Sequence, residues 1–574
     1  MSAAADLVIR GGTLVDGSGG ELCEADVAVK DGRIAAIGRG LPHGREEIDA
    51  TGRIVTPGFI DIHTHYDGQV TWENSLAPSS FHGVTTAVTG NCGIGFAPCR
   101  AGDREDLIRL MEGVEDLPEA VLSAGLPWAW ESFPDYLDFV GSRCFDMDVA
   151  PQLPHAALRV YAMGRRAIDR EQATEADRAA MARLAKEAVA AGAIGFATSR
   201  TINHRASDGT LVYTLDADEE ELAAIGMALG EAGRGVMQVV SDYADPDREL
   251  SMLRRVVERA GRPLSVSLGQ THATPDTWRT VLDWIEGCNA DGLEVRAQVC
   301  GRPVGLLLGY ELSFHPFSYT PTWKSLLPLP VEQRLRALRD PAIRAAITGE
   351  MPDAGDFISA DYIRQFQLMY PLGDPVNYEF APGSSVASRA AALGVTPAEH
   401  AYDLMLEQDG RAVLMLPSIN FADETLTAPE AMLRHPNTVY GLGDGGAHLG
   451  FLCDASLPTY MLQHWVRERT AGDRLPLADV VAGLSARPAA AVGLHDRGLL
   501  RPGYRADINV IDFDGLALLQ PRIAYDLPMG GKRLTQKARG YVATVLNGIA
   551  VQRDDVPTGA LPGRLVRGAQ PAPA

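Results

Sequence analysis

Cysteine and positive charge are both scarce in this sequence. Seven cysteines are scattered over 574 residues without a repeated spacing, which argues against a disulfide framework and favours a reducing compartment. The 52 lysines and arginines are outnumbered by 74 aspartates and glutamates, giving a formal net charge of −22. Binding to a phosphate backbone needs a basic face, so we expect no nucleic acid partner and ascribe the negative charge to solubility.

Long apolar runs are missing as well. No stretch approaches the roughly 20 apolar residues that a membrane-spanning helix needs. The first residues lack the basic segment and apolar core of a signal peptide. We therefore expect a cytoplasmic protein without a membrane partner. Hydrophobic residues make up 46% of the chain, and the length suits one large domain with a smaller one attached.

What the sequence does contain is an alternation of short apolar stretches and helical patterns. Segments rich in alanine, arginine and glutamate, such as Thr174–Ala191 and Arg248–Ala260, separate the apolar stretches. This alternation is typical of βα units in an α/β protein with a parallel sheet. About eight strands are expected, the number in a (β/α)8 TIM barrel. The expected strands are Ile54–His63, Thr85–Thr89, Leu158–Ala162, Ala193–Ala197, Gly235–Val240, Leu264–Leu268, Glu294–Val299 and Thr438–Leu442.

Both ends of the chain are rich in short strands and turn signals. The expected terminal strands are Asp6–Arg10, Asp26–Lys30, Arg33–Ile37, Ala506–Asp512, Gly540–Asn547 and Ile549–Gln552. We expect residues 1–57 and 491–574 to pack together as one small β-sandwich domain beside a barrel at residues 58–490. The tail from Gly568, rich in proline and alanine, is expected to be disordered.

Two long segments of the barrel do not follow the βα repeat. Residues 104–141 carry helical patterns around Trp128 and Trp130, and residues 305–389 contain many prolines. Insertions of this size in a barrel usually serve as lids or as contacts between subunits. The second role would make the protein a homo-oligomer.

The stretch with the strongest chemical signal follows the first expected strand. His63 and His65 are spaced i, i+2, so on a strand their side chains point to the same side. Two neutral imidazoles presented together suit Zn²⁺ or a similar divalent ion. After the second strand, Cys92 stands in the glycine-flanked turn Gly90-Asn91-Cys92-Gly93. A buried free cysteine is usually a small hydrophobe, but beside a divalent cation it becomes a thiolate ligand.

An aspartate follows the last expected strand. Asp444 lies in Gly441-Leu442-Gly443-Asp444-Gly445-Gly446-Ala447-His448. An aspartate before two glycines is compatible with an ordinary turn. At the carboxyl end of a barrel strand, however, it is placed to serve as a general acid and base facing a bound water and the substrate.

Several motifs together resemble the amidohydrolase superfamily. They are Asp6–Asp16, Pro57–His65 and Gly498–Asp507. Val88–Pro98, with its Gly-Asn-Cys-Gly core, is similar to the N-acyl-D-amino-acid deacylase (D-aminoacylase) branch. The resemblance covers nearly the whole chain. It implies a metal-dependent barrel enzyme in which His63, His65 and Cys92 are metal ligands, the cysteine replacing the carboxylated lysine of hydantoinases. Asp444 matches the catalytic aspartate and is also a possible metal ligand.

The sequence departs from this branch at two positions. The branch places a histidine at the end of strand 5 and another at the end of strand 6, whereas this chain has Gln238 and Gln270 there. A neutral amide is a poor zinc ligand beside imidazole, so we expect one tightly bound zinc, a second metal without its usual ligands, and glutamines that line the pocket. His272 lies just beyond strand 6. It is either a substitute ligand or, as we favour, an ordinary loop histidine.

The implied reaction is hydrolysis of a linear amide, an N-acyl-D-amino acid, by metal-activated water with Asp444 moving the proton. The carboxylate of such a small-molecule substrate needs a cationic anchor, for which Arg205 and Arg302 are candidates. Two alternatives stay open. A cyclic-amide hydrolase of the hydantoinase or dihydroorotase type would need a metal-bridging lysine at the end of strand 4. The segment at this position, Gly192–Arg200, contains no lysine. A non-catalytic scaffold would explain the missing histidines.

Overall fold

Parallel strands form the centre of the computed structural model, which describes residues 5–353, 355 and 358–573. β6 (Phe59–Asp61) pairs with β7 (Val84–Thr89), and β7 pairs with β8 (Asp148–Pro151). One residue further on, β9 (Leu153–Pro154) continues the parallel series. The series runs through β10 (Gly195–Arg200), β11 (Val236–Ser241), β12 (Leu264–Leu268), β13 (Val295–Val299) and β17 (Thr438–Tyr440).

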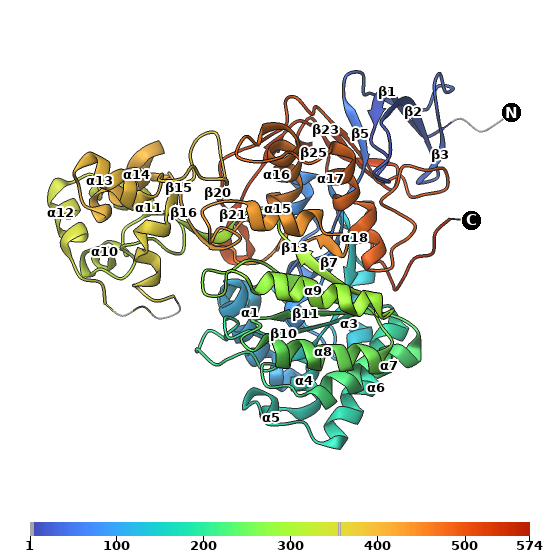
Figure 1. The fold of residues 1–574 in the computed structure, drawn as a ribbon, viewed down its shortest axis with the longest axis horizontal. Coiled ribbons are helices and arrows are strands. Elements are labelled where there is room, and N and C mark those ends of the chain that lie inside the picture. Colours follow the sequence, from blue (N-terminus) through green and yellow to red (C-terminus); the bar gives the residue numbers. More distant parts are fainter. Residues whose placement is uncertain (1–4, 354, 356–357, 574) are drawn as a thin grey trace.

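The two ends of this series meet. A parallel bridge joins Thr64, just after β6, to Gly445, just after β17. His65 N donates to Gly445 O at 2.8 Å and Asp444 N donates to His63 O at 2.9 Å. The residues after the first and last strands are therefore held side by side. Helices follow several strands (Figure 1): α6 (Glu175–Ala191), α7 (Glu219–Ala232), α8 (Pro246–Ala260) and α9 (Thr277–Ala290).

Most of the expected central strands are present, but one is wrong. Leu158–Ala162 belongs to helix α4 (His155–Met163), and the strand at this point is β8 continued by β9. Nearly every side chain of α4 is buried, so its short apolar run has no exposed face that would distinguish a helix from a strand. The expected strand Ile54–His63 is divided at Gly58 into β5 (Ile54–Pro57) and β6.

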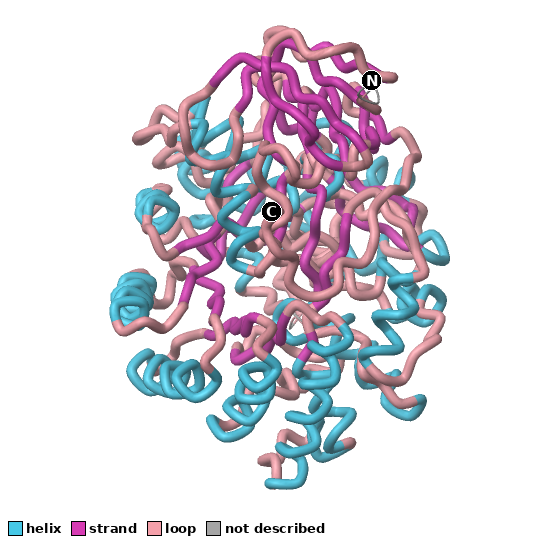
Figure 2. Tube along the Cα trace, turned by 90° about the vertical axis from the view of Figure 1, so that its right-hand side faces the viewer, coloured by secondary structure: helices cyan, strands magenta, loops and turns pink. Residues whose placement is uncertain are grey.

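The two ends of the chain share one sheet. In the described part of the chain it has nine strands, in the order β25-β24-β23-β18-β5-β1-β2-β3, with β4 beside β1. At its centre β5 pairs with β18, with Thr56 opposite Asn509. Figure 2 shows these strands gathered at one end of the molecule. The other strands are β1 (Leu7–Leu14), β2 (Cys23–Lys30), β3 (Arg33–Gly38), β4 (Glu46–Asp49), β18 (Ile508–Ile511), β23 (Tyr541–Leu546), β24 (Ile549–Arg553) and β25 (Val556–Pro557).

The expected disorder of the C-terminal tail is also wrong. Gly568 N donates to Gly192 O at 2.8 Å, and Gln570 N donates to Gly493 O at 2.9 Å. These backbone bonds depend on a neighbouring segment rather than on side-chain composition, which is why composition alone was misleading.

A buried ion cluster ties the parallel strands to the C-terminal segment. Arg497 donates to Asp148 Oδ2 at 2.8 Å and to Thr86 Oγ1 at 3.0 Å. Arg505 lies 2.8 Å from the same carboxylate oxygen. Removing one member of such a buried pair usually costs about 3–5 kcal/mol, because the remaining charge is left unpaired in the interior.

The long insertion near residues 305–389 forms a lobe with its own apolar core, coloured yellow in Figure 1. It extends further than expected, because β14 (Val304–Leu308) pairs antiparallel with β16 (Leu414–Ile419), which also pairs with β15 (Tyr370–Pro371). Its helices are α10 (Pro321–Leu326), α11 (Val331–Ala337), α12 (Pro341–Gly349), α13 (Val386–Leu393) and α14 (Pro397–Gly410).

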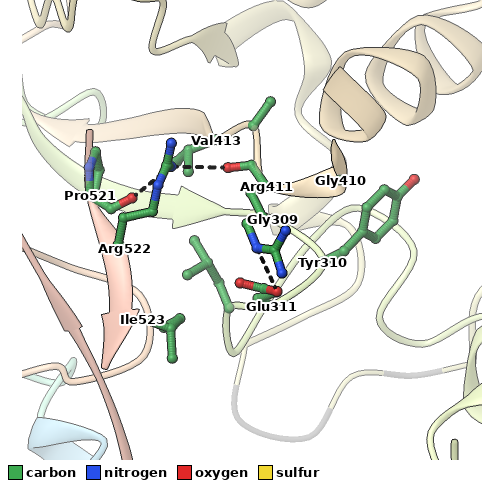
Figure 3. Close-up of a pocket in the computed structure, with 11 residues that line it drawn as sticks. Gly309, Tyr310, Glu311, Gly410, Arg411, Val413, Pro521, Arg522 and Ile523 are labelled. Atoms are coloured by element: carbon green, nitrogen blue, oxygen red, sulfur yellow. Dashed lines mark hydrogen bonds and ion pairs between the residues drawn. The ribbon is translucent and has the colours of Figure 1, made fainter. Parts of the chain in front are cut away.

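A small hollow lies between this lobe and the start of the hairpin formed by β20 (Arg522–Leu527) and β21 (Gly531–Thr535) (Figure 3). Arg411 lies 3.2 Å from Glu311 there, and Arg522 donates to Arg411 O at 3.5 Å. None of the expected site residues lines this hollow, whose walls come from the lobe and from residues 521–523 of the C-terminal segment.

The shorter insertion is helical, as expected. It contains α1 (Arg104–Glu115), α2 (Glu119–Gly125) and α3 (Phe133–Gly141). Trp130 is buried and donates to Phe96 O at 2.8 Å, and its ring packs at 5.8 Å from that of Trp128. Trp130 therefore belongs to the interior, and Trp128 is half-buried beside it. No helix in the described chain is both long and apolar enough to span a membrane.

Candidate metal centre

The structure brings His63, His65 and Cys92 together. One ligand atom from each side chain lies within 4.8 Å of the others, and all three residues are buried. Cys92 Sγ lies 3.3 Å from His63 Nε2. Residues from the ends of neighbouring strands thus converge on one point, as the spacing of the motifs predicted.

The two histidines are placed by the short segment after β6. His63 N donates to Asp61 Oδ1 at 3.1 Å, and burial raises the pKa of Asp61 to about 7. The Asp61 carboxylate packs so closely on Gly443 that a Cβ there would lie 2.1 Å from Oδ2. Glycine at this position therefore lets the segment after β17 approach the histidines.

Cys92 is held in an unusual backbone conformation. Its φ is +55°, and those of Asp444 and His448 are +46° and +49°. Such left-handed conformations are uncommon for residues other than glycine and tend to gather at functional sites. The Cys92 amide is fixed by donation to Gln238 Oε1 at 3.1 Å.

Both imidazoles have their Nδ1 atoms directed at acceptors. His63 Nδ1 lies 2.7 Å from Gln298 Oε1, and His65 Nδ1 lies 3.2 Å from Glu115 Oε1. The Gln298 acceptor places the ring proton of His63 on Nδ1 and leaves its Nε2 with a lone pair, the arrangement that metal-binding histidines commonly show. His65 Nδ1 has no hydrogen-bond partner in the described structure. The two Nε2 atoms face the same carboxylate oxygen, Asp444 Oδ1, at 3.5 and 3.7 Å.

The charges of the cluster act on one another. Burial raises the pKa of the Cys92 thiol, but the charge and hydrogen bond of His63 outweigh it and lower that pKa overall. Burial likewise raises the pKa of Asp444, yet the hydrogen bond from His65 and the charge of His63 bring it down to about 2. The neighbouring imidazoles therefore lower the pKa of both the thiol and the carboxyl group.

These donors fit a zinc ion. Two imidazole nitrogens and a thiolate are the ligand types that zinc prefers, and three protein ligands leave a position for water or substrate. Asp444 stands close enough to the same point to act as a further ligand or as a proton carrier.

The glutamines have three different roles. Gln238 supports the backbone of Cys92, and its Nε2 donates to Ser267 Oγ at 3.3 Å. Gln298 orients His63. Gln270 instead donates to Asp423 Oδ2 at 2.7 Å and accepts from Ala422 N at 3.2 Å, so its amide is engaged by a neighbouring loop.

His272 does not join the three-residue cluster found among the described residues. Its Nε2 lies 3.2 Å from Pro417 O, as the loop-histidine interpretation favours.

The two candidate anchors for a substrate carboxylate differ in their surroundings. Arg205 is exposed and donates to Gly209 O at 3.5 Å within its own turn. Arg302 is buried, pairs with Asp454 and donates to Cys453 O at 2.6 Å. The Nε and Nη1 atoms of Arg302 have no hydrogen-bond partner in the described structure.

The sequence did not reveal Glu115, which occupies the last position of α1 inside the insertion at residues 104–141. It is buried and contacts His65 although fifty residues separate them in the chain. A single glutamate at the end of an amphipathic helix gives no local signal of this role. The only hint was its position in an insertion of the kind that often covers a barrel's site.

Comparison with known proteins agrees with these motifs. The model of the amidohydrolase family matches residues 46–552. An N-acyl-D-aspartate deacylase of Alcaligenes xylosoxydans xylosoxydans is 30% identical over 531 residues, covering 89% of this chain and 86% of the relative. An N-acyl-D-glutamate deacylase of the same organism is 28% identical over 575 residues, covering 99% and 97%.

A solved structure shares the fold. The N-acyl-D-glutamate deacylase from Bordetella bronchiseptica, in complex with zinc and a phosphonate inhibitor, has a TM-score of 0.65 at 23% identity, over 98% of this chain and 100% of that one. The family model and the full-length relatives lead to one conclusion. This chain belongs to the amidohydrolase family, in the branch that holds the D-aminoacylases.

Proposed function

We propose that this protein is a zinc-dependent deacylase that hydrolyses N-acyl-D-amino acids. The observation that carries the proposal is the convergence of His63 Nε2, His65 Nε2, Cys92 Sγ and Asp444 Oδ1 at the ends of parallel strands. The names of the relatives, deacylases of N-acyl-D-aspartate and N-acyl-D-glutamate, support the substrate class.

His63, His65 and Cys92 would hold one zinc ion. When bound there, zinc polarises the amide carbonyl and lowers the pKa of water, so that hydroxide is available near neutral pH. We expect no second tight site, because Gln238 and Gln270 stand where the branch has histidines and their amides already make hydrogen bonds to Ser267 and Asp423.

Asp444 moves the proton. Its carboxylate accepts the proton of the attacking water and then gives it to the leaving nitrogen, so that the products are a carboxylic acid and a free amine. Asp444 N donates to His63 O at 2.9 Å, which holds the backbone of Asp444 beside the histidines.

Arg302 is the better of the two candidate anchors for the substrate carboxylate. Its buried Nε and Nη1 atoms lack partners, and a buried donor without a partner is costly unless a ligand satisfies it. Arg205 is exposed in its turn and already solvated, so ordering it on a substrate gains less.

The overall fold is consistent with a deacylase of this family. We infer that the parallel series from β6 to β17 is a (β/α)8 barrel whose strand ends carry the site, with residues 1–57 and 491–574 forming the smaller domain. All seven cysteines are free, which supports a cytoplasmic location.

A panel of matched N-acyl-D- and N-acyl-L-amino acids tests the proposal. The zinc-loaded protein should release free amine from D substrates and leave their L partners largely intact, and a chelator should stop the reaction. Ring opening of a hydantoin or dihydropyrimidine without any N-acyl-amino-acid hydrolysis would favour the cyclic-amide alternative. Tight zinc binding without turnover of either class would favour a scaffold.

A further inference from the structure

The segment that carries the two histidines also contacts the loop that carries Asp444. Gln69, four residues after His65, is fully buried, and its Nε2 donates to Gly446 O at 2.8 Å. A carbonyl oxygen can only accept, so this bond fixes the Gln69 amide with its nitrogen toward the loop. Because the amide is neutral, the contact does not depend on a protonation state.

Gly446 lies in a tight turn that begins at Asp444. Ala447 N donates to Asp444 O at 3.1 Å, and Gly446, the third residue of the turn, has φ of +85°, a conformation that glycine adopts readily. A Cβ at Gly446 would lie 2.8 Å from Tyr66 Cδ1. The turn is therefore packed directly on the Tyr66 ring and hydrogen-bonded to Gln69.

The backbone conformation of Asp444 needs such support. Its φ is +46°, and left-handed conformations of residues other than glycine persist only where the surrounding structure enforces them. The carboxylate at this turn is the one whose Oδ1 lies 3.5 Å from His63 Nε2 and 3.7 Å from His65 Nε2. A shift of the turn would therefore change the distance from the carboxylate to both imidazoles.

The oxygen of the Gln69 amide points to a role other than packing. Oε1 is buried and has no hydrogen-bond partner in the described structure. A buried acceptor without a partner is costly, so an amide is a poor group for merely filling this space. This cost favours a role for the donor that reaches Gly446 O.

We propose that Gln69 is a positioning residue for Asp444. Its bond to Gly446 O holds the turn, so that the Asp444 carboxylate stays beside the Nε2 atoms of the two histidines. This inference rests on the proposed function, in which Asp444 moves the proton. It places no atom of Gln69 on the substrate, so Gln69 should influence kcat and not substrate binding.

Gln69→Met tests the bond, because methionine keeps the length of the side chain but has no N–H to donate. The substitution should lower kcat for an N-acyl-D-alanine by about 10–100-fold, the cost of a misplaced catalytic group. KM and zinc content should stay unchanged. A raised KM with unchanged kcat would overturn the proposal.

Gln463→Met is the matched control. Gln463 is also a buried glutamine, but its Nε2 donates to Glu468 Oε2 at 2.9 Å and its Oε1 accepts from Leu518 N at 2.8 Å. This variant should keep the kcat of the wild type. An equal loss of kcat in Gln463→Met would show that any lost buried amide slows the enzyme, and would overturn a specific role for Gln69.

A double-variant cycle separates positioning from a general loosening of the protein. If Gln69 acts through Asp444, adding Gln69→Met to Asp444→Asn should cost little further turnover. A full additional loss would overturn the proposal. Gln69→Asn keeps the amide but is one methylene shorter, and it should give the same pattern if the methionine variant does not fold.

Hydrogen exchange of the turn needs no turnover. The backbone amides of residues 444–450 should exchange about 3–10-fold faster in Gln69→Met, the worth of one lost hydrogen bond in the local opening equilibrium. Unchanged exchange would overturn the positioning role. A wild-type protein that hydrolyses no N-acyl-amino acid would overturn the proposed function, and hydrogen exchange would then still decide whether Gln69 holds the turn.

Discussion

Asp444→Asn is expected to lower turnover of an N-acyl-D-amino acid by about 10²–10⁴-fold, the usual contribution of a general acid and base. The asparagine keeps the size and the backbone hydrogen bond to His63 O but cannot take up the proton of the attacking water. Zinc content should change little, because His63, His65 and Cys92 remain. Steady-state release of free amine and metal analysis of the same sample provide the two readings.

Asp473→Asn is a matched control for this substitution. Asp473 is an exposed loop aspartate, so the same change of chemistry there should leave turnover unaltered. Wild-type turnover in Asp444→Asn would mean that the proton is handled elsewhere. His448, four residues on, would then be the first residue to examine.

His63→Ala combined with His65→Ala should abolish tight zinc binding and, with it, hydrolysis. Only the Cys92 thiol of the three-residue cluster would remain, and a lone thiolate cannot satisfy a tetrahedral zinc ion. The protein should stay folded, because the backbone bonds from His65 N to Gly445 O and from Asp444 N to His63 O do not depend on the histidine side chains. Metal analysis after dialysis, together with circular dichroism, measures both expectations.

The control for this double variant removes two exposed histidines instead. His43→Ala combined with His495→Ala should keep full zinc content, since both side chains lie on the surface and neither is part of the cluster. Stoichiometric zinc in the His63/His65 variant would show that the tight site is built from other residues.

Motifs with fixed local spacing predicted that the groups of the candidate site lie close together. The i, i+2 pair His63 and His65, the glycine-flanked Cys92 and the glycine-flanked Asp444 each sit directly after a strand. Parallel strands bring their carboxyl ends to one edge, so local position along the chain is enough to predict that these groups meet.

Contacts that depend on tertiary packing were not predictable in the same way. Glu115 reaches His65 only because α1 folds over the strand ends. Arg302 is drawn into a pair with Asp454, more than a hundred and fifty residues away. Helix α4 was mistaken for a strand because its apolar run is buried on nearly all sides. These contacts and this burial depend on segments far away in the sequence, so the local sequence pattern could not predict them.

The most direct measurement is a zinc titration of metal-free wild-type protein, read as free amine released from an N-acyl-D-amino acid. Activity should rise in proportion to added zinc and level off at about one equivalent per chain, as three protein ligands at a single site require. Full activity without added metal, or a rise that continues to two equivalents, would contradict a single zinc held by His63, His65 and Cys92.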